Sequence, residues 1–395
     1  MKILLTGLIL SLAVGCSSKP TFPTEKISDI RKRVETKIAQ KILKEVRQDL
    51  PKLKGSMRSD YLQKRTDQFR QSVDLTAINI RTQQEFQLLK YITAAERIRW
   101  HGENYENQLR AMSSLKVNLP DLEALVISSL ANIDSTLAEL IGEPALHVHS
   151  HMQEMRDLTI YPADSVAGRQ AYLDALEREI LSSYKRWQHA ATGKHRDIEL
   201  RGLEKGWPTF YYENDVLTIG LNDVEALPYF ELASIAAFYG YPGRAALSTS
   251  SVSPSLKSLL QLPAFKLGWA WYRLDKIIEE DIIQRRQHLY FSKLMTISAL
   301  ADLRLNTTAW SKDEAANNIY PETPYTLTRI NNMLTTVQNK PGYYLSAFAG
   351  KTKLTEIESR CISNCKSTLP QRLIALGPLP FDLLEERLVA ERFIQ

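Results

Sequence analysis

Three histidines alternate within a short segment of this chain, and they are spaced so that their side chains could bind a metal ion. The sequence holds 7 histidines in all, and His147, His149 and His151 are followed by Glu154. On a helix, His147, His151 and Glu154 would share one face, because positions i, i+4 and i+7 lie above one another. Imidazole and carboxylate groups are ligands that zinc accepts. Clustered histidines are also common on solvated helix faces, so the sequence leaves a metal site and a surface cluster both open.

Two cysteines near the C-terminus could form a disulfide bond. Cys361 and Cys365 remain when Cys16 near the N-terminus is set aside, and an oxidising compartment would favour their pairing. On an uninterrupted helix, two cysteines one turn apart would have difficulty in reaching disulfide geometry. The bond therefore requires the helix to end at Ser363-Asn364. Metal binding by the two thiols is the alternative.

The common signatures of other catalytic sites are missing from the sequence. It contains no G-x-S-x-G nucleophile elbow, no P-loop and no G-x-G-x-x-G fingerprint. Ser248, Ser250 and Ser251 could be proposed as nucleophiles, but a serine-rich break after a helix is ordinary loop composition.

The stretch from Phe210 to Leu247 provides the elements around which the rest of the chain can be arranged. Its first part, to Ile219, predicts a hairpin with a turn at Asn214-Asp215. Apolar residues then recur at the spacing of a helix that includes Tyr239. Tyr241-Pro242-Gly243 interrupts this helix, since proline cannot continue it. The predicted order is strand, strand, helix and break.

Helices are expected over most of the remaining chain. The composition is 44% hydrophobic and 24% charged, which is typical of a globular, helix-rich protein. An apolar row from Ile27 to Val46 ends at Pro51, and a long amphipathic helix is predicted from about 164 to 190. Ile198-Glu199-Leu200 begins a small sheet that leads to the hairpin.

This order of strand, helix and YPG break resembles a bacterial family, the domain of unknown function 885, whose members are similar to zinc peptidases of the HExxH superfamily. The equivalent family stretch reads HEAYPGHHLQ, in which the first and a later His bind zinc and the Glu is the general base. The resemblance extends from about 197 to 390 and is faint before 197. Four further segments match family motifs in the same order, namely Leu267–Tyr272 (LGWAWY), Asp302–Trp310 (DLRLNTTAW, with Asn306 at a His position), Pro341–Ser346 (PGYYLS) and Leu379–Arg387 (LPFDLLEER).

The positions that would hold zinc and its general base carry other residues here. Phe238 and Tyr239 stand in place of HE, Arg244 and Ala245 in place of HH, and Leu267 in place of the third ligand, a Glu. Zinc catalysis needs three protein ligands and a base. The resemblance therefore implies a peptidase-like fold without metal, cofactor or catalytic residues, in which Phe238 and Leu267 are neighbours. Large apolar side chains at these positions would refill the vacated volume as core.

The resemblance also implies the fold class and a candidate cleft. The fold is expected to be mostly α-helical (α+β), with a small antiparallel sheet beside the former active-site helix. Arg244, beside Tyr239 and Tyr272, could bind a carboxylate such as a peptide C-terminus through paired hydrogen bonds. The alternative is an Arg244 side chain that turns outward or pairs with Glu231.

The N-terminus resembles a bacterial lipoprotein signal peptide. Lys2 precedes an apolar run, and residues 12–16 (LAVGC) resemble a lipobox in which Cys16 is acylated. Residues 1–15 would be the signal peptide and 16–24 a tether. By resemblance to Gram-negative lipoproteins, Ser17 favours the outer membrane, with the protein facing the periplasm. The alternative is a secretory leader cleaved near Gly15.

The segment after the tether is basic. Between Glu25 and Arg70 there are 14 Lys/Arg and 7 Asp/Glu, an excess of 14 − 7 = 7 positive charges. A basic amphipathic helix here could lie on an anionic membrane, or it could pack its apolar row on the domain and leave a solvated basic face. An exported protein without a nucleic-acid motif is not expected to bind nucleic acid.

No linker is visible after residue 24, so one continuous domain is expected from residue 25 to 395. The sequence predicts an envelope lipoprotein with a catalytically inactive peptidase-like fold and a binding or scaffolding role, whose ligand is an envelope peptide or protein. A hydrolase that uses other residues, such as His147 and His151, and a structural protein with a closed cleft are the alternatives.

Overall fold

The computed structural model describes residues 24–101, 104–142, 148–158, 160–161, 165–187, 197–203, 210–213, 215–221, 227–248, 256–260, 262–277, 281–307, 309–362 and 365–395. Cys16, the predicted signal peptide and His147 lie outside these residues. The chain groups into two compact units. The first comprises Met1–Glu103 and Ser253–Leu260, and the second comprises Asn104–Val252 and Gln261–Gln395. The sequence led us to expect one continuous domain.

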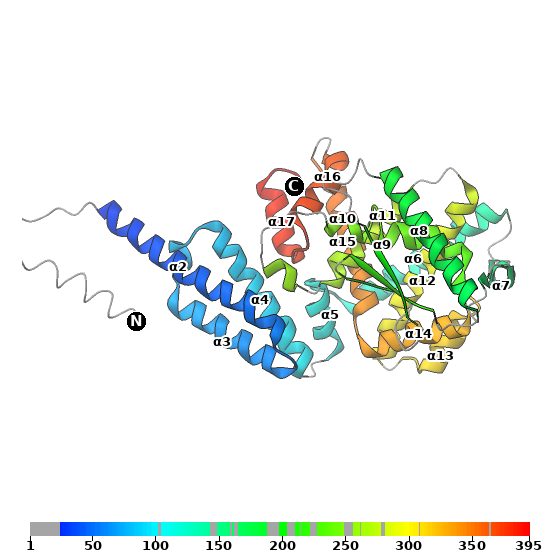
Figure 1. The fold of residues 1–395 in the computed structure, drawn as a ribbon, viewed down its shortest axis with the longest axis horizontal. Coiled ribbons are helices and arrows are strands. Elements are labelled where there is room, and N and C mark those ends of the chain that lie inside the picture. The colour runs from blue at the N-terminus through cyan, green and yellow to red at the C-terminus, as the bar shows by residue number, and fades with distance from the viewer. Residues whose placement is uncertain are drawn as a thin grey trace, which may run out of the picture. The chain divides into compact units, whose positions relative to one another are not determined.

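The first unit is helical in its described part, with its own hydrophobic core. Its elements are α2 (Thr24–Asp49), η1 (Leu50–Lys52), α3 (Ser56–Ser72), η2 (Leu75–Ala77), α4 (Ile80–His101) and η6 (Leu256–Leu259). The three α-helices contact one another (Figure 1). Phe69 stacks on Phe86 with 4.2 Å between ring centroids, and Val46 and Leu62 are fully buried. This separate core explains why the chain divides without a recognisable linker.

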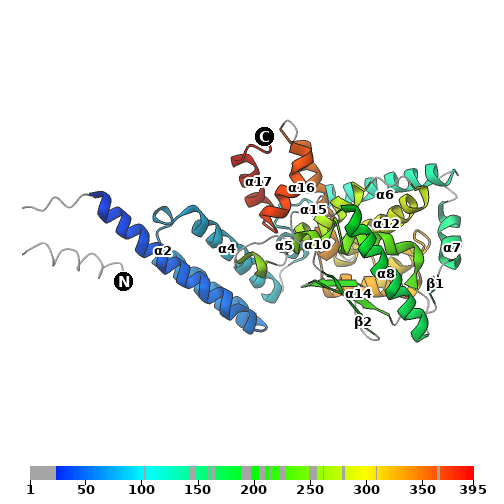
Figure 2. The same ribbon diagram turned by 45° about the horizontal axis from the view of Figure 1, so that its top comes forward.

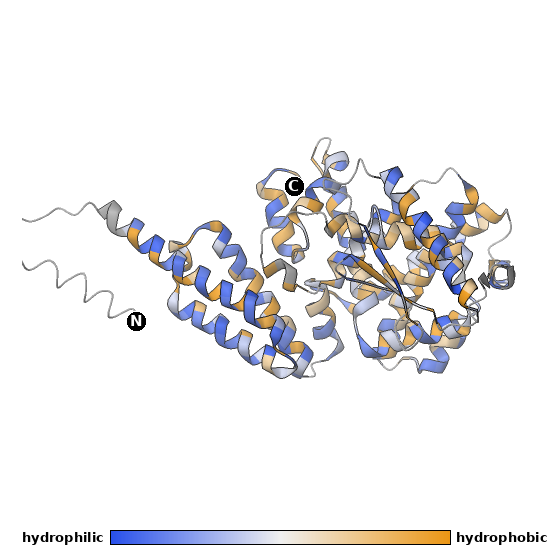
Figure 3. Ribbon diagram, in the orientation of Figure 1, coloured by the Kyte–Doolittle hydropathy of each residue, from blue (hydrophilic) through white to orange (hydrophobic). Residues whose placement is uncertain are grey.

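The apolar row predicted for α2 is buried only along part of the helix. Ile42 and Val46 are buried, whereas Ile30 is 60% exposed. Figure 3 shows hydrophilic and hydrophobic bands alternating along α2. The helix ends at Asp49, two residues before Pro51, because proline lacks the N–H that would continue the hydrogen-bond pattern.

The second unit contains the remaining elements. Its helices are α5 (Tyr105–Ser113), α6 (Leu119–Ile141), α7 (Val148–Leu158), α8 (Val166–Trp187), η5 (Tyr229–Glu231), α9 (Leu232–Tyr239), α10 (Arg244–Ser248), α11 (Pro263–Asp275), α12 (Ile282–Asn306), α13 (Lys312–Ile319), α14 (Leu327–Asn339), α15 (Tyr343–Ser359), α16 (Cys365–Leu376) and α17 (Phe381–Ala390). Its strands are β1 (Ile160–Tyr161), β2 (Glu199–Leu203), β3 (Phe210–Glu213), β4 (Val216–Gly220) and β5 (Leu227–Pro228). The prediction of a mostly helical fold is confirmed.

The small sheet is mixed, so the prediction that it is antiparallel is wrong for one strand pair. Its strand order is β2-β4-β3. β3 and β4 form the predicted antiparallel hairpin, with Tyr212 opposite Leu217. β2 pairs in parallel with β4, with Leu200 opposite Leu217. The chain reverses twice between β2 and β4, so these two strands run in the same direction, and β4 occupies the centre of the sheet.

Helices α11, α12 and α15 form the centre of the second unit. Most residues of α12 between Gln287 and Leu303 are buried. α11 and α15 approach so closely that glycine is required where they meet. A Cβ on Gly350 would lie 1.8 Å from the carbonyl oxygen of Ala264, and one on Gly268 would lie 2.7 Å from the Gly350 carbonyl carbon. This contact fixes the two helices that carry several residues of the candidate site.

Among the described helices, α6 is the one that is long and apolar enough to cross a membrane. It packs along α12 (Figure 2), and Ile133 and Leu137 belong to the hydrophobic core. Leu125 and Ile127 on its outer side are about half exposed. Length and composition alone are weak evidence for a single helix, so we infer no membrane span.

Candidate functional site

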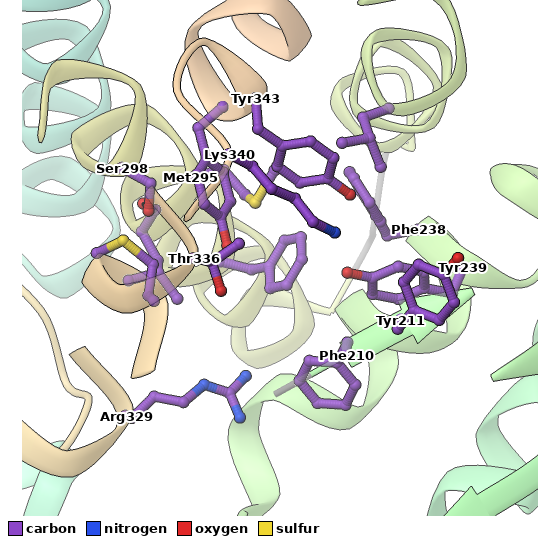
Figure 4. Close-up of a pocket in the computed structure, with 15 residues that line it drawn as sticks. Phe210, Tyr211, Phe238, Tyr239, Met295, Ser298, Arg329, Thr336, Lys340 and Tyr343 are labelled. Carbon is purple, nitrogen blue, oxygen red and sulfur yellow. Dashed lines mark hydrogen bonds between the residues drawn. The ribbon is translucent and has the colours of Figure 1, made fainter. Parts of the chain in front are cut away.

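A small pocket lies at the helix that the family resemblance singles out. Its volume is about 50 Å³, which is room for a few water-sized groups. Its apolar lining residues are Phe210, Phe238, Leu267, Phe291, Leu294, Met295 and Met333. Its polar lining residues are Tyr211, Tyr239, Ser298, Arg329, Thr336, Lys340, Tyr343 and Tyr344 (Figure 4). We call this site the aromatic pocket.

The two positions that were expected to be neighbours both line this pocket. Phe238 is fully buried and Leu267 is 3% exposed. The Phe238 ring packs edge-on against Phe291, with 5.4 Å between centroids, and against Tyr239, with 4.9 Å. These side chains fill the wall of the pocket as a hydrophobic core does.

The YPG break fixes the end of α9 against α11. The Tyr241-Pro242 peptide bond is cis. A Cβ on Gly243 would lie 2.1 Å from the carbonyl oxygen of Phe238, so only glycine fits this turn. The Gly243 carbonyl accepts a hydrogen bond from the buried Trp269 indole at 3.0 Å. Two of the motifs that suggested the family thus contact each other and hold α9 beside α11.

Two further motifs meet through Asp302, whose role the sequence analysis missed. Asp302 is buried and accepts hydrogen bonds from the backbone N–H groups of Gly342 (2.8 Å), Tyr344 (2.9 Å) and Leu345 (3.1 Å) at the start of α15. Asn306 also donates to it, at 3.1 Å. Burial raises the pKa of Asp302 to about 7, against the opposing effect of these backbone hydrogen bonds. Asp302 therefore positions Tyr343 and Tyr344 in the pocket wall.

The tyrosines of the pocket are protonated at neutral pH. Burial, with a hydrogen bond to Glu213, raises the pKa of Tyr211 to about 12. Burial also raises the pKa values of Tyr239, Tyr343 and Tyr344. The hydroxyl groups of these side chains are therefore neutral, and each has one proton to donate. The Tyr211 hydroxyl donates its proton to Glu213.

Arg329 brings a buried, neutralised cation to one end of the pocket. Its Nη2 donates to Glu231 Oε2 at 2.7 Å, and the Tyr172 hydroxyl donates to the other Glu231 oxygen at 3.0 Å. Glu231 is fully buried and Arg329 is 3% exposed. The guanidinium carbon lies 4.6 Å from the centroid of the Phe210 ring. A buried carboxylate of this kind requires such a partner.

Lys340 brings a second cation to the opposite end of the pocket. It lies between α14 and α15, directly before Pro341-Gly342. Its Nζ is 5.5 Å from the Tyr211 ring centroid and 5.3 Å from the Tyr343 ring centroid. Figure 4 shows the ammonium group reaching toward the space between these rings. The sequence offered one signal for this residue, which is its place beside the PGYYLS motif.

The candidate cleft of Tyr239, Arg244 and Tyr272 is not assembled as expected. Tyr239 lines the aromatic pocket, but Arg244 and Tyr272 are not among its lining residues. Arg244 donates to the Tyr212 carbonyl at 3.3 Å and lies over the Tyr212 ring. Tyr272 packs near Trp269 instead. The residue types alone could not reveal that Arg244 donates to a carbonyl of the sheet and that Arg329 and Lys340 supply the cations of the pocket.

Glu231 is not the partner of Arg244, because it pairs with Arg329. Arg244 still influences its surroundings through its charge. Burial lowers the pKa of Lys266 to about 8, and the nearby Arg244 adds to this lowering. The same charge opposes the rise in the pKa values of Tyr239 and Tyr343.

The two described histidines of the cluster, His149 and His151, form hydrogen bonds with neighbouring side chains. His151 Nε2 lies 2.6 Å from the Tyr290 hydroxyl, and its Nδ1 lies 3.9 Å from Glu154. His149 Nε2 lies 2.7 Å from Glu322, which also pairs with the buried Lys293. Within the described ranges, no group of three His, Cys, Asp or Glu side chains could hold a metal ion.

Cys361 and Cys365 are joined by a disulfide bond, with 5.4 Å between their Cα atoms. α15 ends at Ser359 and α16 begins at Cys365, so the two cysteines do not share a helix. Cys361 also forms a β-bridge with Ile394, which places the C-terminal residues beside the disulfide.

Comparison with known proteins identifies the family. A family model described as bacterial protein of unknown function (DUF885) matches residues 11–388, so the chain belongs to this family. The chain is similar to the crystal structure of a candidate lipoprotein from Colwellia psychrerythraea, with 15% identity and a TM-score of 0.61, over 93% of this chain and 76% of that one. It is also similar to a candidate lipoprotein of unknown function from Shewanella oneidensis, with 10% identity and a TM-score of 0.54, over 91% and 72% of the two chains. At these identities the likeness concerns the fold alone. None of the curated proteins matches.

Proposed function

We propose that this DUF885 protein is an envelope lipoprotein that binds a carboxylate group in the aromatic pocket and cleaves nothing there. One observation carries the proposal. The described residues that line the pocket include two cations and four tyrosines, but no His, Cys, Asp or Glu. In this proposal the fold is that of a zinc peptidase whose metal site has been refilled with core side chains.

The lining residues cannot supply zinc-dependent hydrolysis. A catalytic zinc site needs three His, Cys or carboxylate ligands and a base that takes a proton from the bound water. Phe238 and Leu267 offer only hydrocarbon, and Tyr239 remains a neutral phenol because burial raises its pKa. Lys340 adds a positive charge that would repel a dication.

The same residues suit a small anion. The Lys340 ammonium and the neutral hydroxyl of Tyr343 are donors, and hydrogen bonds between such donors and a carboxylate are strong in a desolvated site. A volume of about 50 Å³ has room for a carboxylate group. We infer that the ligand inserts a terminal carboxylate, as a peptide or protein C-terminus would.

Binding to peptides that differ only at the C-terminus tests this function. Calorimetric titration with a mixture of short peptides that end in a free carboxylate should give saturable heat, and the C-terminal amides should bind about tenfold more weakly or worse. Lys340→Gln should lower the affinity for the free acids by a similar factor. Lys366→Gln, which removes an exposed cation outside the pocket, is the matched control. Equal binding of acids and amides would refute the proposed ligand class.

We propose that lipidation of Cys16 anchors the protein in the outer membrane, where the protein faces the periplasm. The sequence of residues 12–16 supports it, and the two similar structures are of candidate lipoproteins. Labelled palmitate should enter the unaltered protein and not the Cys16→Ser variant. An unlabelled, soluble periplasmic protein would exclude the anchor but would leave the pocket proposal intact.

A further inference from the structure

The exposed face of α2 carries a row of cations that no described carboxylate neutralises. Arg33, Lys37, Lys41 and Lys44 are all exposed, and none of them forms an ion pair with a described residue. Other charges of the same helix are paired, as Arg31 is with Glu35. We call these four residues the basic stripe.

The basic stripe and the buried side of α2 lie on opposite faces of the helix. Successive residues of an α-helix are separated by about 100°, so the four cations lie within a sector of about 80°. The buried residues of the helix centre on the opposite direction; they are Ala39, Ile42, Leu43 and Val46. Packing within the first unit therefore holds the stripe outward. The exposed Ile30 lies on the same outward face.

The length of chain before α2 keeps this face close to the proposed anchor. α2 begins at Thr24, eight residues after Cys16 in the sequence, and eight residues extend at most about 28 Å. The stripe itself covers roughly 17 Å of helix, at 1.5 Å per residue. A helix of this length beside an acylated cysteine can lie along the membrane surface.

We propose that the basic stripe docks the first unit on anionic phospholipid headgroups. Lys and Arg side chains near an anionic bilayer each increase partitioning by about fivefold, and the attraction falls off over the Debye length. The proposal rests on lipidation of Cys16 only for tethering. The stripe should recognise anionic lipid without the acyl chain, so the two proposals can fail separately.

Vesicle binding by unlipidated protein tests the proposal. The chain from residue 16 onward, with Cys16→Ser, is mixed with vesicles of phosphatidylglycerol and phosphatidylcholine in equal parts, or of phosphatidylcholine alone, and the sedimented fraction is measured. We expect sedimentation with the anionic vesicles that decreases as salt is added. Replacing Arg33, Lys37, Lys41 and Lys44 by Gln should reduce partitioning by more than tenfold, and by about 600-fold if each cation contributes its full fivefold.

A second variant separates the stripe from net charge. Lys116, Arg178, Lys185 and Lys366 are exposed cations of the second unit, and replacing these four by Gln removes the same total charge. This control should bind anionic vesicles as the unaltered protein does. Three outcomes would overturn the proposal. They are an equal loss of binding in both variants, binding to neutral vesicles, and stripe-dependent binding to an anionic cell-wall polymer in place of lipid. Circular dichroism is used to check that each variant is folded.

Discussion

Glu231→Gln should destabilise the second unit by about 3–5 kcal/mol, the cost of leaving a buried charge without its counter-charge. Glu231 is fully buried, and it accepts hydrogen bonds from Arg329 at 2.7 Å and from Tyr172 at 3.0 Å. Glutamine keeps the shape and loses the charge, so Arg329 would remain desolvated without a counter-charge. Such a loss is a large share of the roughly 5–15 kcal/mol that stabilises a folded domain.

Thermal unfolding followed by circular dichroism measures this loss. In a domain of this size, 1 kcal/mol shifts the unfolding midpoint by about 2–4 °C. The Glu231→Gln midpoint should therefore fall by roughly 6–20 °C. Glu199→Gln removes one partner of an exposed pair with Arg201 and is the matched control, with a cost below about 1 kcal/mol. The double variant Glu231→Gln, Arg329→Met should recover part of the loss, because it leaves no uncompensated cation.

The same variant links stability to the aromatic pocket. Arg329 lines the pocket, so a bound carboxylate can replace part of the missing Glu231 charge. A peptide with a free C-terminus should raise the midpoint of Glu231→Gln more than that of the unaltered protein. Equal midpoints for Glu231→Gln and Glu199→Gln, or a double variant less stable than the single one, would refute the reasoning.

Three further outcomes are expected. Purified protein should carry no stoichiometric zinc and should cleave no peptide library with or without added metal; Phe238→His should not create activity, and chelator-sensitive cleavage lost in His151→Ala would contradict this. The pKa of Lys266 is lowered to about 8 from an ordinary 10.5, so between these pH values the folded protein binds fewer protons than the unfolded chain. The free energy of unfolding should therefore rise with pH across that window. Lys266→Met lacks this titration and should show a smaller rise when unfolding in urea is measured. Reduction of the Cys361–Cys365 bond should cost about 2 kcal/mol, as the closure entropy of so short a loop implies, and Cys361→Ser should make unfolding insensitive to reductant.

Local patterns were sufficient to predict several elements of this protein. The spacing of apolar residues predicted the helix that became α9, and Tyr241-Pro242-Gly243 marked its end, because helix period and proline chemistry act over a few residues. The hairpin of β3 and β4 was likewise predicted, since its turn and strands are adjacent in the sequence. The parallel pairing of β2 with β4 was not predicted. Which strand lies beside β4 depends on where the tertiary fold places another segment of the chain, and no local pattern records this.

The composition of the site needed the tertiary structure. The sequence identified Phe238, Tyr239 and Leu267 as the positions of interest, since the resemblance to family motifs led us to expect zinc ligands and a base there. It could not show that Arg244 donates a hydrogen bond to the Tyr212 carbonyl. The partner of a long side chain depends on which polar groups the tertiary fold brings within its reach. Lys340 and Arg329, far along the chain, reach the pocket because α14 and α15 both pack on α12, which also contacts α9. Charges that define a site from several helices are juxtaposed by packing, and no local pattern records that juxtaposition.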